Sequence, residues 1–234
     1  MSCPYRHDIS LPDMPASIAK LEVDERGYPI PFFVDYLPDG TPEFRAADAK
    51  KLVRCVKEAL CWVCGEKLHA SRLGFKSTLA FAIGPMCVVN RISAEPPSHP
   101  ACAEWSARNC PFLARPHAKR REDEHFNAQV QAELQPGIPL RRNPGVTAVW
   151  YCGGFQIQPT KTGPLFNVGK LTKPISWWKE GRTATREEIM ESISTGLPSL
   201  QATCAEEATP ELRAAALADL DRALITALKL VPRA

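Results

Sequence analysis

The apolar positions of this chain fall into short runs broken by prolines and glycines, which predicts many short elements. Large apolar residues recur through residues 28–36 and stop at the turn Pro38-Asp39-Gly40, so a short strand is expected there. Asp48 is a suitable N-cap for a helix that reaches residue 60. Apolar residues recur along this helix at spacings of three and four: Leu52, Val53, Val56 and Leu60.

The next apolar run, residues 78–89, is β-prone and has Gly84-Pro85 in its middle, which predicts two short strands joined by a turn. Pro96 and Pro97 then stop the sheet, and Ser98 is the expected N-cap of a helix over residues 100–109. Residues 120–134 are highly charged with a narrow apolar stripe, which is the pattern of a surface helix.

The C-terminal half combines strands with two helices. Residues 146–178 hold large apolar residues between glycine and proline turns, which predicts a small antiparallel sheet. Thr185 and Glu188 form a capping box for a helix whose expected end is Gly196. A last helix opens at Thr209, and its apolar stripe needs a docking surface, either the chain's own core or a partner chain: Leu212, Ala216, Leu217, Leu220, Leu224, Leu228 and Val231. The oligomeric state stays open.

Composition narrows the class of protein. The chain has 234 residues, is 44% apolar and carries a net charge of +3, so it can bury a core but has no strong general attraction to polyanions. It shows no apolar signal region at its start and no apolar run long enough to cross a bilayer, which predicts a soluble, cytoplasmic protein without membrane contact. Its nine cysteines, an odd number, favour thiols and metal binding over a disulfide framework.

Four residues have the spacing of a zinc site. Cys61 and Cys64 lie three positions apart and Gly65 follows, the pattern of a knuckle whose backbone amides turn toward the thiolates. His99 and Cys102 have the same spacing at a helix start, which brings both side chains to one face and favours a thiolate. Knuckle, hairpin and ligand-bearing helix is the order of a treble clef. Because all four ligands come from the protein, one structural Zn²⁺ is expected.

Two other cysteines are alternatives to His99 as the fourth ligand. Cys110 lies eight residues past Cys102, which is about 12 Å along a helix axis, so it can share the site only if the helix breaks early. Cys87 would approach the site from the predicted hairpin. The sequence favours His99 and leaves both alternatives open.

Several short strings occur in a characteristic order. They are Cys-x-x-Cys-Gly at 61–65, Gly-Pro-Met-Cys at 84–87, Asn-Arg at 90–91, Glu-Pro-Pro-x-His-x-x-Cys-Ala-Glu-Trp at 95–105 and Cys-Pro-Phe-Leu at 110–113. Together they resemble an uncharacterised family of bacterial and phage-borne zinc-binding proteins, over roughly residues 28–198. The resemblance implies a protein of phage or prophage type in a bacterial or phage-infected cell, and it brings no established activity.

The densest basic zone of the chain is a candidate nucleic-acid-binding surface, with Trp105, Trp177 and Trp178 as possible stacking platforms. Its basic residues are Arg115, Lys119, Arg120, Arg121, Arg141 and Arg142. Acidic residues at 122–124 offset much of this charge, so a solvated linker is the alternative interpretation.

Catalytic candidates are fewer. Cys87, Asn90, Arg91 and Glu95 concentrate polar groups beside an apolar strand, and Arg91 is the one nearby cation that could activate a thiolate. Gly153-Gly154 lies among predicted strands but fits no phosphate-loop fingerprint, so it is interpreted as a turn.

The sequence therefore predicts an α+β protein, with a treble-clef-like zinc module and a small antiparallel β unit with flanking helices. The expected segments are an N-terminal arm and helix (1–60), the zinc module (61–115), a charged helical connector (116–143), the β unit with its capped helix (144–200) and a C-terminal amphipathic helix (201–234). We expect a non-enzymatic interaction protein that binds nucleic acid or a protein partner. The alternative is an enzyme that acts on nucleic acid or nucleotides through residues 87–95.

Overall fold

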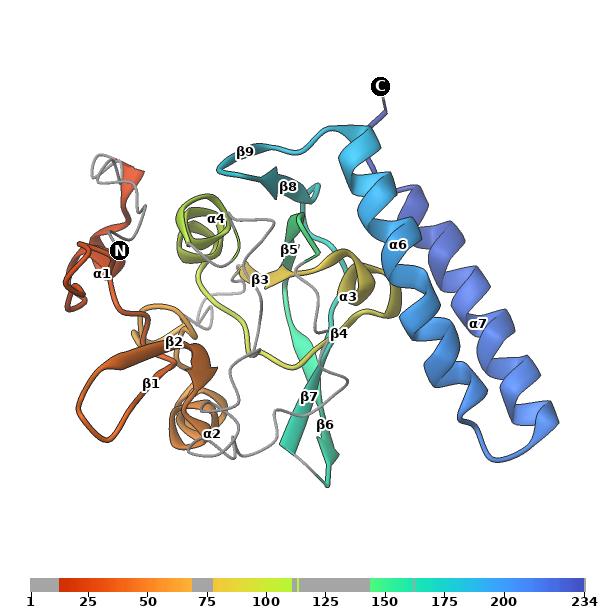
Figure 1. Cartoon of the computed structure of the whole chain (residues 1–234), viewed down its shortest axis with the longest axis horizontal. Coiled ribbons are helices and arrows are strands. Elements are labelled where there is room, and N and C mark those ends of the chain that lie inside the picture. Colours follow the sequence, from red (N-terminus) through yellow and green to blue (C-terminus); the bar gives the residue numbers. More distant parts are fainter. Residues whose placement is uncertain (1–12, 69–77, 111–112, 114–143, 162, 234) are drawn as a thin grey trace.

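A four-stranded antiparallel sheet lies at the centre of the protein (Figure 1). The computed structural model describes residues 13–68, 78–110, 113, 144–161 and 163–233. Across the central sheet the strands follow the order β3 (Leu79–Ile83), β5 (Thr147–Cys152), β8 (Ser176–Lys179) and β9 (Arg182–Thr183). All six residues of β5 are buried, because this strand has a neighbour on each side and a helix on each face.

Two smaller antiparallel sheets complete the β structure of the described residues. One has the strand order β4 (Ile92–Ser93), β7 (Gly163–Val168) and β6 (Phe155–Thr160), and the other is the hairpin of β1 (Val34–Tyr36) and β2 (Pro42–Ala47). The strands predicted within residues 146–178 are therefore present, but they belong to two sheets. The reason is that β5 and β8 join β3, whereas β6 and β7 join β4.

Helices cover both faces of the central sheet. The helix α4 (Pro100–Asn109) packs on one face, and α3 (Pro85–Asn90) packs on the other together with the antiparallel pair α6 (Arg186–Ala205) and α7 (Pro210–Leu228) (Figure 1). Two further helices, α1 (Ala16–Ala19) and α2 (Ala49–Glu58), accompany the β1–β2 hairpin. This mixture of helices with antiparallel sheets confirms the predicted α+β class.

The two faces of the central sheet bury residues of different size. The contact between the sheet and α4 includes small side chains, Ala80 of β3 and Ala103 and Ala107 of α4, which lets the helix approach the strands closely. The opposite face of the sheet contributes large side chains to the main core, where they pack with residues of β7 and α6. The sheet supplies Phe81, Ile83, Trp150 and Trp177, β7 supplies Phe166, and α6 supplies Ile189 and Ile193. Burial of this set in one cluster is the main stabilising contribution of the C-terminal half.

The predicted hairpin over residues 78–89 is wrong in its second strand. The first strand is β3, but Pro85 begins the helix α3 with Gly84 at the N-cap position. Proline suits the first position of a helix because its φ is fixed there and its missing N–H needs no partner. The helix buries Met86 and Val88 in the main core, while β3 pairs with the distant strand β5.

The helix that opens at Thr185 also differs from the prediction. Its capping box is confirmed, but the helix passes through Gly196 and ends at Ala205. Gly196 allows α6 to approach α3 closely, since a Cβ atom there would lie 2.9 Å from Cγ of Met86. The glycine that suggested a helix end therefore marks a packing contact between two helices.

The C-terminal helix docks on the chain's own core. Its N-cap Thr209 is confirmed, and the helix ends at Leu228, before Val231 of the predicted stripe. Leu220 of the helix and Val231, which follows it, are buried in the main core. The other end of the predicted apolar stripe is not covered, because Leu212 is 50% exposed and Leu217 is 39% exposed. The α6–α7 pair extends past the central sheet at that end (Figure 1).

The cap predicted for α2 is confirmed. The Asp48 carboxylate accepts hydrogen bonds from the backbone N–H groups of Lys50 (2.7 Å) and Lys51 (3.3 Å). The helix stops at Glu58, before the predicted end, because Ala59 adopts a left-handed conformation with φ of 53°. Val53, predicted on the apolar face, is 46% exposed.

Some predictions fall on parts of the chain that the structure does not describe. They are the surface helix over residues 120–134 and most of the charged connector. The proposed division into five segments also stays a prediction. Within the described residues, no helix combines the length and the apolar character needed to cross a membrane.

Glu188 contributes to the stability of the folded protein, and this contribution is lost in acid. Its carboxylate accepts a hydrogen bond from the Thr185 backbone N–H (2.8 Å) and pairs with Arg182 (2.6 Å) and Lys179 (3.2 Å). The hydrogen bond with Arg182 is the largest cause that lowers the pKa of Glu188 from 4.5 to about 2. Because the pKa is lower in the folded protein, this stabilisation is complete above about pH 4.5 and is lost as the pH falls toward 2.

We expect Glu188→Gln to reduce the loss of stability between pH 5 and pH 2. Urea unfolding at a series of pH values measures this dependence. The matched control is Glu191→Gln on the same helix, at an exposed position, and it should retain the wild-type pH dependence. An identical pH dependence for Glu188→Gln and wild type would contradict the assignment.

Candidate metal centre

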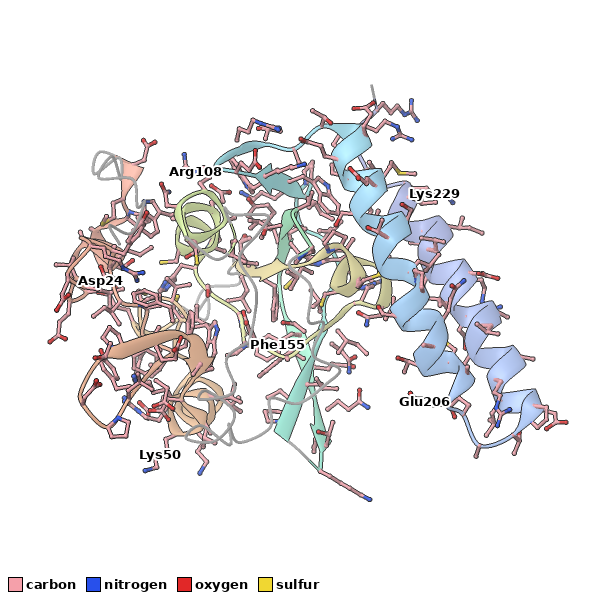
Figure 2. All side chains as sticks on the ribbon, in the orientation of Figure 1. Asp24, Lys50, Arg108, Phe155, Glu206 and Lys229 are labelled. Carbon is pink, nitrogen blue, oxygen red and sulfur yellow. The ribbon has the colours of Figure 1, made fainter. Side chains whose placement is uncertain are left out.

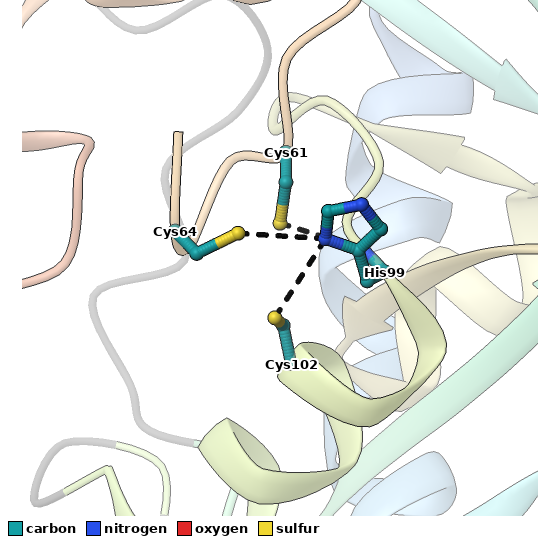
Figure 3. A group of neighbouring side chains, drawn as sticks. All are labelled: Cys61, Cys64, His99 and Cys102. Carbon is teal, nitrogen blue, oxygen red and sulfur yellow. Dashed lines mark hydrogen bonds between the residues drawn. The ribbon is translucent and has the colours of Figure 1, made fainter. Parts of the chain in front are cut away.

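The structure brings together the four residues that the sequence predicts as metal ligands. The sulfur atoms of Cys61, Cys64 and Cys102 and a ring nitrogen of His99 all lie within 4.8 Å of one another (Figure 3). The three cysteines are buried and the histidine is partly buried. Two ligands come from the turn after α2, and two come from the start of α4. Such a group can hold one metal ion.

The turn that carries Cys61 and Cys64 is a hydrogen-bonded knuckle. The Gly65 N–H donates to the Cys61 carbonyl (2.8 Å), and the Cys61 N–H donates to the Glu66 carbonyl (2.8 Å). Gly65 has a φ of 72°, a conformation that glycine adopts without steric cost. The knuckle is held from outside as well, since the Trp62 N–H donates to the Pro97 carbonyl (3.2 Å). Both cysteine side chains are therefore fixed by the backbone.

The second pair of ligands is positioned by α4. The N-cap is His99, one residue later than predicted, and Pro100 is the first helical residue. Ser98 is not available as the cap because its backbone N–H and carbonyl both pair with Ala80 of β3, at 2.8 and 2.9 Å. This pairing attaches the histidine to the central sheet, and the first turn of α4 places Cys102 beside it.

A polar network attaches α4 to the sheet at a second point. The Tyr151 hydroxyl of β5 donates to the Glu104 carboxylate of α4 and also bonds with the Ser176 hydroxyl (2.9 Å). Lys173 pairs with the same carboxylate (3.3 Å). Burial raises the pKa of Tyr151 well above its usual value, which means that the phenol keeps the proton it donates. The ligand-bearing helix therefore has little freedom to move relative to β5.

The imidazole of His99 is oriented by both of its nitrogens. Nδ1 lies 3.4 Å from the Cys64 sulfur and 3.9 Å from the Cys102 sulfur (Figure 3). Nε2 lies 3.2 Å from the backbone carbonyl of Lys67. A carbonyl oxygen only accepts hydrogen bonds, so Nε2 carries a proton and Nδ1 faces the sulfur atoms. Histidines that bind metal ions are commonly held in this way, by a hydrogen bond from the second nitrogen to a carbonyl.

The cluster favours a thiolate at Cys61. Hydrogen bonds with the Cys102 and Cys64 side chains are the largest causes that lower the pKa of Cys61, and the His99 side chain and the Cys64 backbone N–H add to them. The His99 backbone N–H also donates to the Cys61 sulfur (3.4 Å). The hydrogen bond between Cys61 and Cys102 raises the pKa of Cys102. Hydrogen bonds with Cys61 and Cys64 raise the pKa of His99 to about 10. Negative charge on the Cys61 sulfur is therefore stabilised by the hydrogen bonds of the cluster, and a bound cation would stabilise it further.

An apolar shell surrounds the four ligands. Ile18 of α1, Val63 of the knuckle and Trp105 of α4 are buried with the three cysteines in one cluster. The Ser17 hydroxyl lies 3.4 Å from the Cys102 sulfur. The short helix α1 therefore closes the site on the side away from the central sheet (Figure 1).

Neither alternative ligand is part of the group. Cys87 lies on α3 and packs against the main core, on the other face of the central sheet from α4. Cys110 is the C-cap of α4, where its N–H donates to the Ser106 carbonyl (2.8 Å), a helix length away from Cys102. Within the described part of the chain, the geometry selects His99 as the companion of the three cysteines.

Of the predicted nucleic-acid site, the structure describes the three tryptophans but none of the basic residues. All six of its basic residues, from Arg115 to Arg142, lie outside the described residues. The prediction that Trp105 and Trp177 are stacking platforms is wrong, because they are 5% and 2% exposed and belong to the core. Trp178 is partly buried below the guanidinium of Arg108, which lies 5.4 Å from its ring centre.

The candidate catalytic residues do not converge on one cleft. Arg91 lines a surface groove, but Cys87 and Asn90 are not part of its lining in the described structure. Two contacts of the metal centre, with the Lys67 carbonyl and the Ser17 hydroxyl, are not among those predicted from the sequence. The first could be inferred from the knuckle, since Leu60 and Lys67 form the bridge that closes it. The second depends on folding of a distant segment and has no local signal.

Comparisons of the chain with protein-family models, curated proteins and solved structures gave no match. The resemblance to a bacterial and phage-borne family therefore stays a prediction without independent support.

Changing Gly65 to alanine should weaken both the fold and the metal centre. A Cβ atom there would lie 2.6 Å from Cδ2 of Phe32, in addition to the strain of a φ of 72°. The matched control is Gly40→Ala in the β1–β2 turn, which has a φ of 85° but no atom within 4 Å of the added Cβ. We expect Gly40→Ala to cost about 1 kcal/mol through strain, and Gly65→Ala to cost about 2 kcal/mol more through the collision.

Urea unfolding and a chelator competition measure the two effects of Gly65→Ala. The knuckle interpretation predicts that this variant loses both stability and metal affinity, whereas Gly40→Ala loses stability alone. Equal losses in the two variants would show that the contact with Phe32 has no energetic role.

Proposed function

We propose that Cys61, Cys64, His99 and Cys102 bind one Zn²⁺ ion with a structural role. The observation that carries this proposal is the convergence of three sulfur atoms and one imidazole nitrogen within 4.8 Å. Thiolate and imidazole ligands suit Zn²⁺, whereas Ca²⁺ and Mg²⁺ prefer oxygen ligands. The hydrogen bond of His99 Nε2 with the Lys67 carbonyl supports the same assignment.

The proposed module is treble-clef-like in part. The knuckle and the start of α4 supply the two ligand pairs in the expected order along the chain. The predicted hairpin between the two ligand pairs does not form, because β3 pairs with β5 of the central sheet. Ala80 of β3 also forms a bridge with Ser98, the residue before the histidine. We therefore propose a treble-clef-like module in which the central sheet takes the place of the second hairpin strand.

The proposed ion links two parts of the fold. The knuckle belongs with α1, α2 and the β1–β2 hairpin, while α4 packs on the central sheet. An ion bound to both would hold the N-terminal segment against the sheet. Because protein side chains fill all four tetrahedral positions, no position is left for a reacting water molecule. This arrangement favours a non-enzymatic protein.

The zinc-bound protein is proposed to bind a macromolecular partner, either nucleic acid or another protein. Support for a protein partner comes from the uncovered apolar residues of α7, where Leu212, Leu217 and Ile225 are between 39% and 57% exposed. Support for nucleic acid comes from the exposed basic residues Lys50, Arg54 and Lys57 of α2. The alternative, an enzyme that uses residues 87–95, retains one favourable observation in the groove beside Arg91.

Light scattering and absorbance of the purified, zinc-loaded protein test the proposed interaction. We expect the protein to retain nucleic acid that nuclease treatment removes, or to bind a defined protein partner in solution. A double variant, Leu217→Asp with Ile225→Asp, should abolish protein binding alone, and Lys50→Gln with Lys57→Gln should abolish nucleic-acid binding alone. Hydrolysis of nucleotides by the zinc-loaded protein without any macromolecular partner would contradict the proposal and favour the enzyme.

A further inference from the structure

A surface groove lies at the junction of two of the sheets. It has a volume of about 770 Å³ and is lined by Arg91 after α3, by the turn between β5 and β6, by the paired ends of β6 and β7, and by the residues that follow β7. Phe155, labelled in Figure 2, begins β6 in its wall. The volume falls within the range of about 300–1,000 Å³ that is typical of small-molecule sites. None of the four proposed zinc ligands lines it.

The charged residues that line the groove are cations. Its lining contains the cations Arg91 and Lys170 together with the neutral polar residues Gln156, Asn167 and Thr172. No aspartate or glutamate belongs to the lining among the residues that the structure describes. Burial raises the pKa of Cys152 below the groove, so this thiol adds no negative charge. The cations are therefore not neutralised within the groove, which favours an anionic ligand.

Arg91 is held in place for such a role. It adopts a φ of 58°, a conformation that costs free energy for a residue other than glycine. Its guanidinium donates to the Val168 carbonyl (2.6 Å) and lies 5.2 Å from the ring centre of Trp150. A guanidinium has five N–H donors, so the bond to Val168 leaves donors for a ligand. An arginine fixed in this way loses little entropy when it binds an anion.

Glycines leave the backbone of the groove uncovered. Gly153 and Gly154 form the turn before β6, and Gly169 follows β7. A Cβ on Gly169 would lie 2.0 Å from the Gly154 carbonyl oxygen, so the two segments touch through their backbones. Absence of side chains here allows a ligand to approach the main chain closely. Leu171 and Phe155 add an apolar contribution that inorganic phosphate would not use.

We propose that this groove binds a small organic phosphate of nucleotide size, with its phosphate on Arg91 and Lys170 and its organic part against Phe155 and Leu171. Arginine and lysine are the usual partners of phosphate groups. The size of the groove and its apolar wall favour an organic phosphate over a free phosphate ion. This site goes beyond the proposed structural zinc and does not depend on it.

Equilibrium binding at low ionic strength tests the proposal, with adenosine monophosphate, adenosine and inorganic phosphate as probes of the zinc-loaded full chain. We expect adenosine monophosphate to bind more tightly than both other probes. Arg91→Gly should weaken its binding about tenfold or more, the size of one charge-assisted hydrogen bond. Lys170→Gln should weaken it several-fold, and the charge-matched control Lys161→Gln, at an exposed position outside the lining, should bind like wild type.

Glycine at position 91 relieves the strained φ, and Lys170 is exposed, so both variants should fold; thermal unfolding checks this directly. Failure of the wild type to bind any of the phosphate probes would overturn the proposal. Unchanged binding in both variants would overturn it too. Binding of single-stranded DNA through Arg91, without binding of the mononucleotide, would replace it with a nucleic-acid groove.

Discussion

Replacing Cys64 with serine is expected to remove the metal ion and to unfold the N-terminal part of the protein. The sulfur of Cys64 is one of the four converging ligand atoms, and it lies in a buried cluster with Ile18 and Trp105. Structural Zn²⁺ sites have apparent binding free energies of about 10–16 kcal/mol, whereas a whole domain is stable by only about 5–15 kcal/mol. Loss of one ligand therefore removes a contribution comparable to the total stability.

Metal content and thermal unfolding measure this effect, and other substitutions sharpen it. His99→Ala should behave like Cys64→Ser, whereas His99→Cys should keep the metal because it supplies a fourth thiolate. Cys87→Ser and Cys110→Ser are matched controls that should keep the metal, since neither cysteine is in the cluster. Stable folding of Cys64→Ser and His99→Ala without metal would contradict a structural role.

The second large effect is expected from Gly169→Ala. The added Cβ would lie 2.0 Å from the oxygen and 3.0 Å from the carbonyl carbon of Gly154, and both are backbone atoms. Neither segment can move freely, because the Gly169 carbonyl accepts a hydrogen bond from Nε1 of Trp150 (2.9 Å) and β6 pairs with β7. We expect a loss of about 3 kcal/mol or more, at the upper end of overpacking effects.

Gly154→Ala is the matched control for Gly169→Ala. An added Cβ at Gly154 has no atom within 4 Å, so its effect should stay within about 0.5 kcal/mol of wild type. Urea unfolding at neutral pH compares the two variants. Equal midpoints for Gly169→Ala and Gly154→Ala would contradict the close backbone contact.

Features that depend on neighbouring residues could be predicted from the sequence. The caps at Asp48, Thr185 and Thr209 are confirmed because each is set by a side chain and the next few N–H groups. The four converging residues could also be found from sequence, because a knuckle and a helix start place residues three positions apart on one side. In both cases the geometry of a few neighbouring residues is sufficient for the prediction.

Features set by distant contacts could not be predicted. The apolar run after Gly84 suits a strand or a buried helix equally well, and its packing against α6 and α7 decides for the helix. Gly196 suggested a helix end, whereas its contact is with Met86, far away in the sequence. The same limit applies to Trp105 and Trp177, whose burial depends on how α4 and β8 pack. Sequence patterns alone did not distinguish these core residues from exposed aromatic residues.

The metal content of the purified protein shows whether the four converging residues hold a zinc ion. The full chain is purified in buffers freed of metal ions, confirmed as folded, and analysed by inductively coupled plasma mass spectrometry against protein concentration. The geometry of Cys61, Cys64, His99 and Cys102 predicts one zinc ion per chain that dialysis does not remove. Folded protein that holds no zinc, or holds another metal in its place, would contradict a structural zinc ion at these residues.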